Sequence, residues 1–319
     1  TGNGTSQTIT GLEFSPDLVW GKARSRTNTH WLMDTVRGAG QRLVSAETSA
    51  EDTKTDILSA FTSDGFTIGG NGESNFSNAT YVGWAWDGGT STVSNTDGSI
   101  TSSVRANASA GFSIATFTTP SSGTFTFGHE LSAAPELILA KARDQSYSWA
   151  VYAKPVGNDK YLVLNTSAAA ATGPIWNDTT PTSSVVSGKA SNFGTSTDYV
   201  AYCFAPVDQY SSFGSFEGNG DADGTFVYTG FRPAFLLIKR TDASSSWYIF
   251  DSARSTFNVV DDRLQAHSSN AENTNSAWNN DFLSNGFKLR TTEIELNNSG
   301  SAYIYAAFAE HPFKTSRAR

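Results

Sequence analysis

Short apolar or alternating segments, separated by turn residues, run along the whole chain. Segments of this length with Gly, Pro, Asn, Asp and Ser between them are typical of the strands of a β-sandwich or jelly roll. The sequence therefore predicts an all-β protein. In the middle third the expected strands are Gly111–Thr118, Gly123–Gly128, Glu136–Lys141, Ser148–Tyr152, Tyr161–Asn165, Ser183–Val186 and Tyr199–Val207.

The apolar pattern also separates central strands from strands with one wet face. Phe125-Thr126-Phe127 alternates, which indicates one buried face. Leu137-Ile138-Leu139 is apolar throughout, which indicates a strand buried on both faces. Helical spacing is weak, and a helical turn is expected only at Glu51–Phe61 and Glu272–Phe282.

Two phrases occur three times in the chain. The first is a Pro-led strand, and the second is a closing strand that begins with Tyr. Three copies of one β-rich phrase pair predict three tandem β-sandwich (jelly-roll-like) repeats rather than one large domain. The Pro-led strands are Pro16–Lys22, Pro135–Lys141 and Pro233–Lys239, and the closing strands are Tyr81–Trp86, Tyr199–Phe204 and Tyr303–Phe308.

The repeats set the expected domain boundaries. We expect repeat 1 at 1–88, a linker or hairpin at 89–110, repeat 2 at 111–208, repeat 3 at 209–313 and a tail at 314–319. Repeats 2 and 3 are each preceded by an aromatic strand, whereas Thr1–Gly4 aligns with the residues just after such a strand. Repeat 1 is thus expected to lack its leading strand, supplied by upstream residues or by a neighbouring segment.

Polar phrases recur in repeats 1 and 3 but not in repeat 2. Asp34 and Arg37 match Asp251 and Arg254, and Glu51 has a counterpart in Glu272. Such groups could serve as acid and cation in a site, but we favour ion pairs that stabilise a turn, because an active site rarely needs two copies in one chain. Three tryptophans, Trp31, Trp149 and Trp247, are assigned to one repeated strand in the core.

Composition narrows the function classes. The chain has 319 residues, 16% charged and 13% aromatic, and a net charge of −8, which argues against binding to duplex nucleic acid. Its one cysteine, Cys203, is expected to be a small buried residue, and no internal disulfide is available. No apolar run is long enough for membrane insertion, and no cofactor is expected.

The remaining candidates for chemistry are few. Asp221 and Asp223 place oxygen ligands at alternate positions, as calcium loops do, although a plain Asx turn is the simpler interpretation. Trp176 and Trp278 lie in loops and are the candidate ligand-binding residues, with packing at a sheet edge as the alternative. The histidines His30, His129, His267 and His311 show no metal-ligand spacing and are expected at surfaces or interfaces. No nucleophile or phosphate-loop motif is present, so the chain is not expected to be an enzyme.

Several phrases resemble a family of repeat domains in virion proteins of tailed phages, especially marine and cyanobacterial ones. They are Tyr81–Trp86, Asn95–Ile100, Tyr228–Phe235 and Asp281–Arg290, and the resemblance covers essentially the whole chain. It implies a structural protein of the virion surface, assembled in the host cytoplasm, such as a tail fibre, a spike or a head decoration. It supplies no catalytic residues.

Three functions follow as hypotheses. The first is a virion component for host adhesion or capsid decoration, with other virion proteins and a host-surface glycan as partners. The second is a carbohydrate-binding protein, for which Trp176 and Trp278 must be exposed. The third is a polysaccharide depolymerase, which needs paired carboxylates in a cleft. We also expect a homo-oligomer, a trimer, because several copies raise a weak surface contact to useful avidity.

Overall fold

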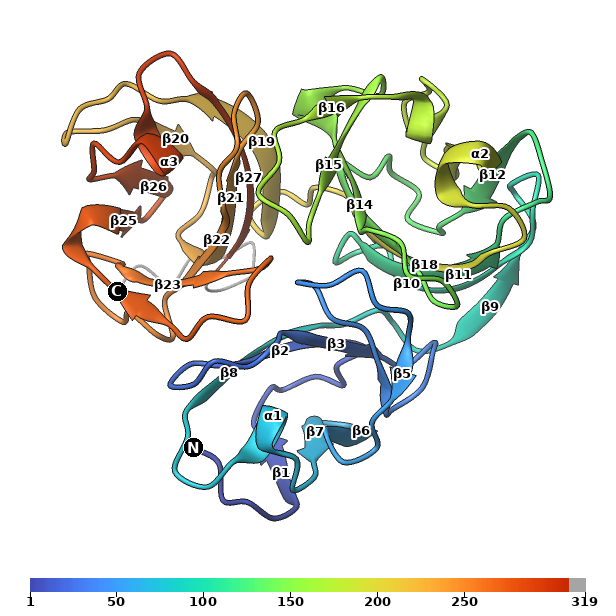
Figure 1. The fold of residues 1–319 in the computed structure, drawn as a ribbon, viewed down its shortest axis with the longest axis horizontal. Coiled ribbons are helices and arrows are strands. Elements are labelled where there is room, and N and C mark those ends of the chain that lie inside the picture. Colours follow the sequence, from blue (N-terminus) through green and yellow to red (C-terminus); the bar gives the residue numbers. More distant parts are fainter. Residues whose placement is uncertain (310–319) are drawn as a thin grey trace.

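The computed structural model describes residues 1–309, and the predicted tail at 314–319 and His311 lie outside the described residues. Three β lobes surround a common centre (Figure 1). The predicted all-β class is confirmed, because the described chain consists of antiparallel sheets with only single helical turns between strands.

The first lobe, unit 1, contains two three-stranded sheets in the orders β3-β2-β8 and β1-β7-β6. A two-stranded ribbon, β4-β5, extends from it. Its elements are β1 (Gln7–Thr10), β2 (Leu18–Ala23), β3 (Trp31–Asp34), β4 (Gln41–Arg42), β5 (Asp52–Thr53), β6 (Leu58–Thr62), β7 (Gly65–Ile68), α1 (Gly72–Asn75) and β8 (Tyr81–Trp86).

Unit 2 contains an eight-stranded sheet in the order β16-β15-β14-β13-β18-β11-β10-β9, with β12-β17 packed outside it. The segment between units 1 and 2 is the hairpin β9–β10 at one edge of this sheet. The elements are β9 (Thr92–Asn95), β10 (Ser102–Asn107), β11 (Phe112–Thr118), β12 (Thr124–Gly128), β13 (Leu137–Ala142), β14 (Ala150–Ala153), η1 (Lys154–Val156), β15 (Lys160–Val163), β16 (Ala171–Thr172), η2 (Pro174–Trp176), β17 (Val185–Lys189), α2 (Ala190–Phe193) and β18 (Asp198–Phe204).

Unit 3 contains a six-stranded sheet, β19-β27-β21-β22-β23-β24, and an outer sheet, β20-β26-β25. Its elements are β19 (Ser211–Glu217), β20 (Phe226–Tyr228), β21 (Pro233–Arg240), β22 (Trp247–Asp251), β23 (Asp262–Gln265), β24 (Asn273–Thr274), η3 (Ser276–Trp278), β25 (Asn280–Leu283), β26 (Gly286–Leu289), α3 (Ile294–Asn297) and β27 (Ala302–Ala309).

The Pro-led and closing strands pair in one register in all three units. Leu18 faces Trp86, Leu137 faces Phe204, and Phe235 faces Phe308. This common register places equivalent residues at equivalent points and is used below to compare the units. That the units superpose as copies of one domain stays a prediction, which the register supports.

Each Pro-led strand is buried on both faces, as predicted for the apolar run at Leu137. One face packs against the outer sheet of its own unit and makes a separate core in each unit. The other face contributes to one central cluster, which draws residues from all three units. A buried Leu, Ile or Phe side chain contributes about 1.5–3 kcal/mol, so the central cluster strongly favours the closed arrangement.

Three equivalent aromatic rings meet in the central cluster. Trp86, Phe204 and Phe308 end the hydrophobic stretch of the three closing strands, and each ring contacts both others. The centroid distances are 6.0, 5.7 and 5.7 Å and the interplanar angles 68°, 70° and 69°. Edge-to-face contacts of this kind contribute about 0.5–1.5 kcal/mol each beyond burial. The three contacts therefore have nearly equal geometry at the centre of the molecule.

Two sequence expectations about local structure are wrong. The helical turn expected at Glu51–Phe61 is wrong, because strands and a turn occur there. Glu272–Phe282 does contain a helical turn, the 3-10 turn η3 between β24 and β25, and the α-helical turns lie just before the closing strands. Trp31 is one residue out of register with Trp149 and Trp247, because it pairs with Gly21 and packs into the core of unit 1. His30 occupies the equivalent position.

Candidate functional site: the seams between the units

The contact regions between units are here called seams 1–2, 2–3 and 3–1. They contain buried ion pairs and lysines with lowered pKa values. At every seam, a ring nitrogen of one unit donates a hydrogen bond to a backbone carbonyl of the unit before it. The three donor–acceptor pairs are Trp149 Nε1 to Val44 O at 2.9 Å, Trp247 Nε1 to Val163 O at 3.0 Å and His30 Nε2 to Gln265 O at 3.0 Å. For His30 this bond requires the Nε2–H tautomer, which fits the bond that its Nδ1 accepts from Trp20 Nε1 at 2.9 Å.

A backbone hydrogen bond also recurs at every seam. It joins a loop of one unit to the residue two positions after the Lys of the Pro-led strand in the next unit. Because it needs no side chain, it persists where the sequence has diverged. The three bonds are Glu51 N to Arg143 O at 2.7 Å, Ala170 N to Thr241 O at 2.9 Å and Glu272 N to Arg24 O at 2.8 Å.

Seam 1–2 adds a buried charged cluster. Arg37 Nε lies 2.5 Å from Asp34 Oδ2, and both side chains are fully buried. Arg37 Nη1 also bonds Glu51 at 2.7 Å, and Glu51 in turn receives Arg143 of unit 2 at 2.9 Å. The Tyr202 hydroxyl of unit 2 donates to Asp34 at 2.8 Å and accepts from Arg37 at 3.0 Å. The expected turn-stabilising ion pair is confirmed, and it also joins two units.

Seam 3–1 carries the same cluster with one substitution. Arg254 bonds Asp251 at 2.5 Å and Glu272 at 2.9 Å, and Glu272 receives Arg24 of unit 1 at 2.8 Å. The indole Nε1 of Trp84 takes the place of the tyrosine hydroxyl and donates to Asp251 at 3.0 Å. A tryptophan has only a donor, so the arginine loses the acceptor that it has at seam 1–2.

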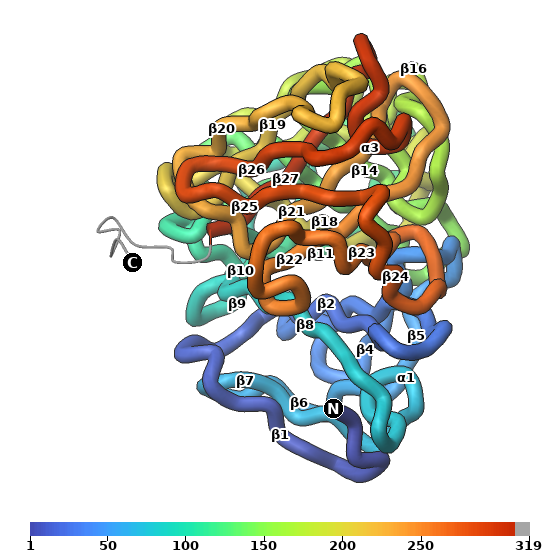
Figure 2. Tube along the Cα trace, turned by 90° about the vertical axis from the view of Figure 1, so that its left-hand side faces the viewer, coloured from blue at the N-terminus to red at the C-terminus, as the bar shows by residue number. Residues whose placement is uncertain are grey.

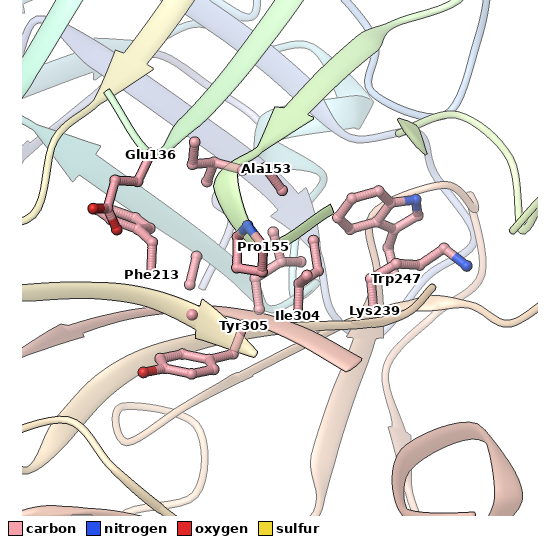
Figure 3. Close-up of a pocket in the computed structure, with 12 residues that line it drawn as sticks. Glu136, Ala153, Pro155, Phe213, Lys239, Trp247, Ile304 and Tyr305 are labelled. Atoms are coloured by element: carbon pink, nitrogen blue, oxygen red, sulfur yellow. The ribbon is translucent and has the colours of Figure 1, made fainter. Parts of the chain in front are cut away.

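Seam 2–3 has lost the cluster. Ala153 pairs with Leu137 where Asp34 pairs with Leu18, so an apolar residue stands in the aspartate position. A small hollow of about 10 Å³ lies here, lined by Ala153, Ala306 and Phe213 among others (Figure 3). The residues in the positions of the charged cluster at this seam are Ala153, Val156, Ala170, Thr241 and Ala306.

The seams shift the pKa values of their carboxylates. Burial alone would raise the pKa of Glu51, but hydrogen bonds from Arg143 and Arg37 outweigh it and lower the pKa below 4.5. Burial alone would also raise the pKa of Glu272, but the hydrogen bonds from Arg24 and Arg254 outweigh it and lower the pKa below 4.5. Burial raises the pKa of Tyr202 well above its ordinary value, so its hydroxyl keeps its proton. These groups are therefore fixed in ionised or neutral form at neutral pH.

Three equivalent lysines reach across or along the seams. Burial lowers the pKa of Lys22, Lys141 and Lys239 to about 8. The amine of Lys141 donates to Thr48 O of unit 1 at 3.0 Å, and that of Lys239 donates to Ser167 O of unit 2 at 3.1 Å. Their role is to satisfy loop carbonyls at the unit boundaries.

The structure does not support Trp176 and Trp278 as ligand-binding residues. Trp176 is 0% and Trp278 9% exposed, so neither ring offers a face to a sugar. Trp176 packs edge-on against Tyr152 and Phe193 at 5.7 and 5.4 Å. Trp278 lies 3.8 Å below the guanidinium of Arg263. Both rings belong to the core of their own unit, which periodicity along the chain does not reveal.

At the candidate calcium loop the structure shows the simpler of the two interpretations, an Asx turn. Asp221 Oδ1 accepts the amide of Asp223 at 2.8 Å, which is an Asx turn. The Asp223 carboxylate bonds Lys288 and Arg290, each at 2.7 Å, so its charge is compensated by protein cations. Within residues 1–309, no group of three His, Cys, Asp or Glu side chains is arranged to hold a metal ion.

The predictions for Cys203 and His30 agree with the structure, whereas the surface or interface position expected for His129 is wrong, because its ring is buried inside unit 2 with Nε2 3.2 Å from Thr182 O. Cys203 is buried, and burial raises the pKa of its thiol to about 12. His30 lies at seam 3–1, as expected of an interface histidine, and burial lowers its pKa well below the ordinary value. No helix among residues 1–309 is long and apolar enough to cross a membrane.

What the sequence did not reveal is that the repeated Asp, Arg and Glu residues join different units. The sequence did contain a signal, a glutamate in one repeat that occurs with an arginine in the next. Glu51 occurs with Arg143 and Glu272 with Arg24, whereas at the third pair of positions both charges are absent and the residues are Ala170 and Thr241. The model of one family, described as a domain of unknown function (DUF7483), matches residues 1–312 and so spans all three units. Neither a curated protein nor a solved structure matches the chain significantly.

Proposed function

Because the chain belongs to the DUF7483 family, a domain of unknown function, we propose its function from its own residues: it is a structural protein of the virion surface of a tailed phage. It serves as a tail fibre, a spike or a head decoration and contributes to adhesion to the host surface. The proposal rests on the resemblance of its repeated phrases to phage repeat domains and on the closed arrangement of the three units.

One observation carries the structural role. At each charged seam the recurring glutamate bonds an arginine of the neighbouring unit, Glu51 to Arg143 at 2.9 Å and Glu272 to Arg24 at 2.8 Å. Charge used in this way fixes unit 1 against both of its neighbours, which suits a rigid surface component. The burial of Trp176 and Trp278 removes the feature that favoured a sugar-binding module.

Locating the protein in the particle tests this proposal. Antibodies raised against the folded chain are expected to label intact purified particles of the phage that encodes it, and the purified chain is expected to slow adsorption of those particles to host cells. Labelling confined to lysed cells, with none on particles, would contradict the virion assignment. Hydrolysis of a host capsular glycan by the chain, abolished by changing one carboxylate, would replace it with an enzymatic role.

A further inference from the structure

The closing strand of unit 1 has a free edge. In units 2 and 3 the closing strand lies between two partners, β18 between β13 and β11 and β27 between β21 and β19. In unit 1 the sheet order is β3-β2-β8, so among residues 1–309 β8 has a strand partner on one side only. It lies at the left end of the unit 1 sheet in Figure 1, and Figure 2 shows it from that side. Accordingly Gly83, in the middle of β8, is exposed, whereas its equivalent Ala201 is buried.

The two partner strands that are present, β11 and β19, define what fits beside a closing strand. Both are antiparallel and seven residues long, and both pair along their whole length. The third residue, Ile114 or Phe213, points to the central cluster. The sixth residue, Phe117 or Phe216, points to the core of its own unit. The pattern is a strand with Ser in second place, an apolar third residue, Ala or Gly in fourth place and Phe in sixth place.

The sixth residue has a specific partner. Phe117 stacks on Tyr199 with ring centroids 5.8 Å apart, and Phe216 stacks on Tyr303 at 5.0 Å. Tyr81 is the equivalent tyrosine of unit 1, and its hydroxyl makes the same kind of bond, to Gly72 O at 3.0 Å, as Tyr303 makes to Ile294. Within the described residues no aromatic ring stacks on Tyr81. Tyr81 thus lacks the ring partner that Tyr199 and Tyr303 have.

The chain enters unit 1 at the end of this free edge. Gly2 exchanges backbone hydrogen bonds with Ala79 and Asn78 at 2.8 and 2.9 Å. Gly218 makes the equivalent pair with Ser301 and Gly300 at 3.0 and 2.9 Å, and it directly follows β19. Thr1 thus stands where the last residue of a leading strand stands in unit 3, and its backbone leads into the position opposite Tyr81.

We propose that the free edge of β8 is a binding site for one further antiparallel strand with the residue pattern of β11 and β19. The strand carries Phe in the place opposite Tyr81 and an apolar residue opposite Trp84, and it completes the unit 1 sheet. The Gly2 pairing fixes the register of such a strand, because it is equivalent to the Gly218 pairing that directly follows β19.

The test places residues 111–117 in front of Thr1. Because residue 118 and residue 1 are both Thr, this fusion recreates the sequence of β11 in the register of the site. The matched control has one extra Gly between the added residues and Thr1, which moves every added side chain to the opposite face. Hydrogen exchange of the amides of β8 is measured in the parent chain, the fusion and the control.

The fusion is expected to slow exchange in β8 at least tenfold relative to the parent and to raise the melting temperature, whereas the control changes neither. Equal exchange in all three proteins would overturn the proposal. A parent whose mass in solution is that of a dimer, with β8 amides already protected from exchange, would overturn it as well. If the fusion does not fold, a labelled peptide of residues 111–118 decides. Saturable binding to the parent, absent for a shuffled peptide, supports the strand site, and no binding refutes it.

Discussion

At the scale of single residues, the seams show how one hydrogen-bonding group organises a buried charge pair. The Tyr202 hydroxyl lies between the two partners of an ion pair, donating to Asp34 and accepting from Arg37. Both charged side chains are fully buried, so every hydrogen bond that they make compensates part of a large loss of hydration. The hydroxyl comes from the neighbouring unit, which ties the stability of the pair to the contact between units.

We expect Tyr202→Phe to lower the free energy of unfolding by about 1–3 kcal/mol, because it leaves a buried carboxylate and a buried guanidinium each one partner short. Chemical denaturation with an unchanged m-value measures this. Tyr161→Phe is the matched control, since that ring is half-buried in unit 2 and away from the charged seams, and its effect is expected within about 0.5 kcal/mol. Equal small effects of both changes would show that the hydroxyl does not support the ion pair.

At the scale of elements, the seams divide into two charged ones and one apolar one. The backbone bond and the ring N–H bond are common to all three, whereas the carboxylate clusters occur only at seams 1–2 and 3–1. The shared backbone contacts therefore fix the geometry, and the side chains set how each seam responds to pH.

Acid is expected to weaken the two charged seams. The pKa values of Glu51 and Glu272 in the folded protein lie below 4.5, so their stabilisation is complete above pH 4.5 and is lost as the pH falls through the lowered values. The free energy of unfolding, followed by denaturation from pH 6 to 3, should therefore fall in acid. In the double variant Glu51→Gln and Glu272→Gln it should be lower at pH 6 and fall less steeply. Glu217→Gln, an exposed site, is the control, and a slope unchanged in the double variant would contradict the assignment.

The sequence predicted the elements better than their assembly. Strand positions in unit 2 followed from turn chemistry and apolar runs, because both are local. The place of Trp176 did not, since a loop aromatic packs inward or outward according to what folds back over it. Likewise the Asp34–Arg37 pair was visible as a turn, but its bond to Tyr202 depends on how two units meet. That information lies in no single segment.

At the scale of the whole molecule, the three units form a closed ring around a common centre. Trp86, Phe204 and Phe308 meet there, and the central cluster contains residues of every unit. A chain that closes on itself presents threefold geometry without a second copy. The expected homotrimer stays a prediction, which mass measurement of the intact assembly decides.

The central claim is that the units depend on one another, and calorimetry of thermal unfolding tests it most directly. A closed ring with a shared core is expected to unfold in one transition, with a ratio of van't Hoff to calorimetric enthalpy of about one. Three units joined only by linkers would give separate transitions, or one broad transition with a ratio of about one third. A single transition with equal enthalpies supports the closed ring, and resolved transitions would contradict it.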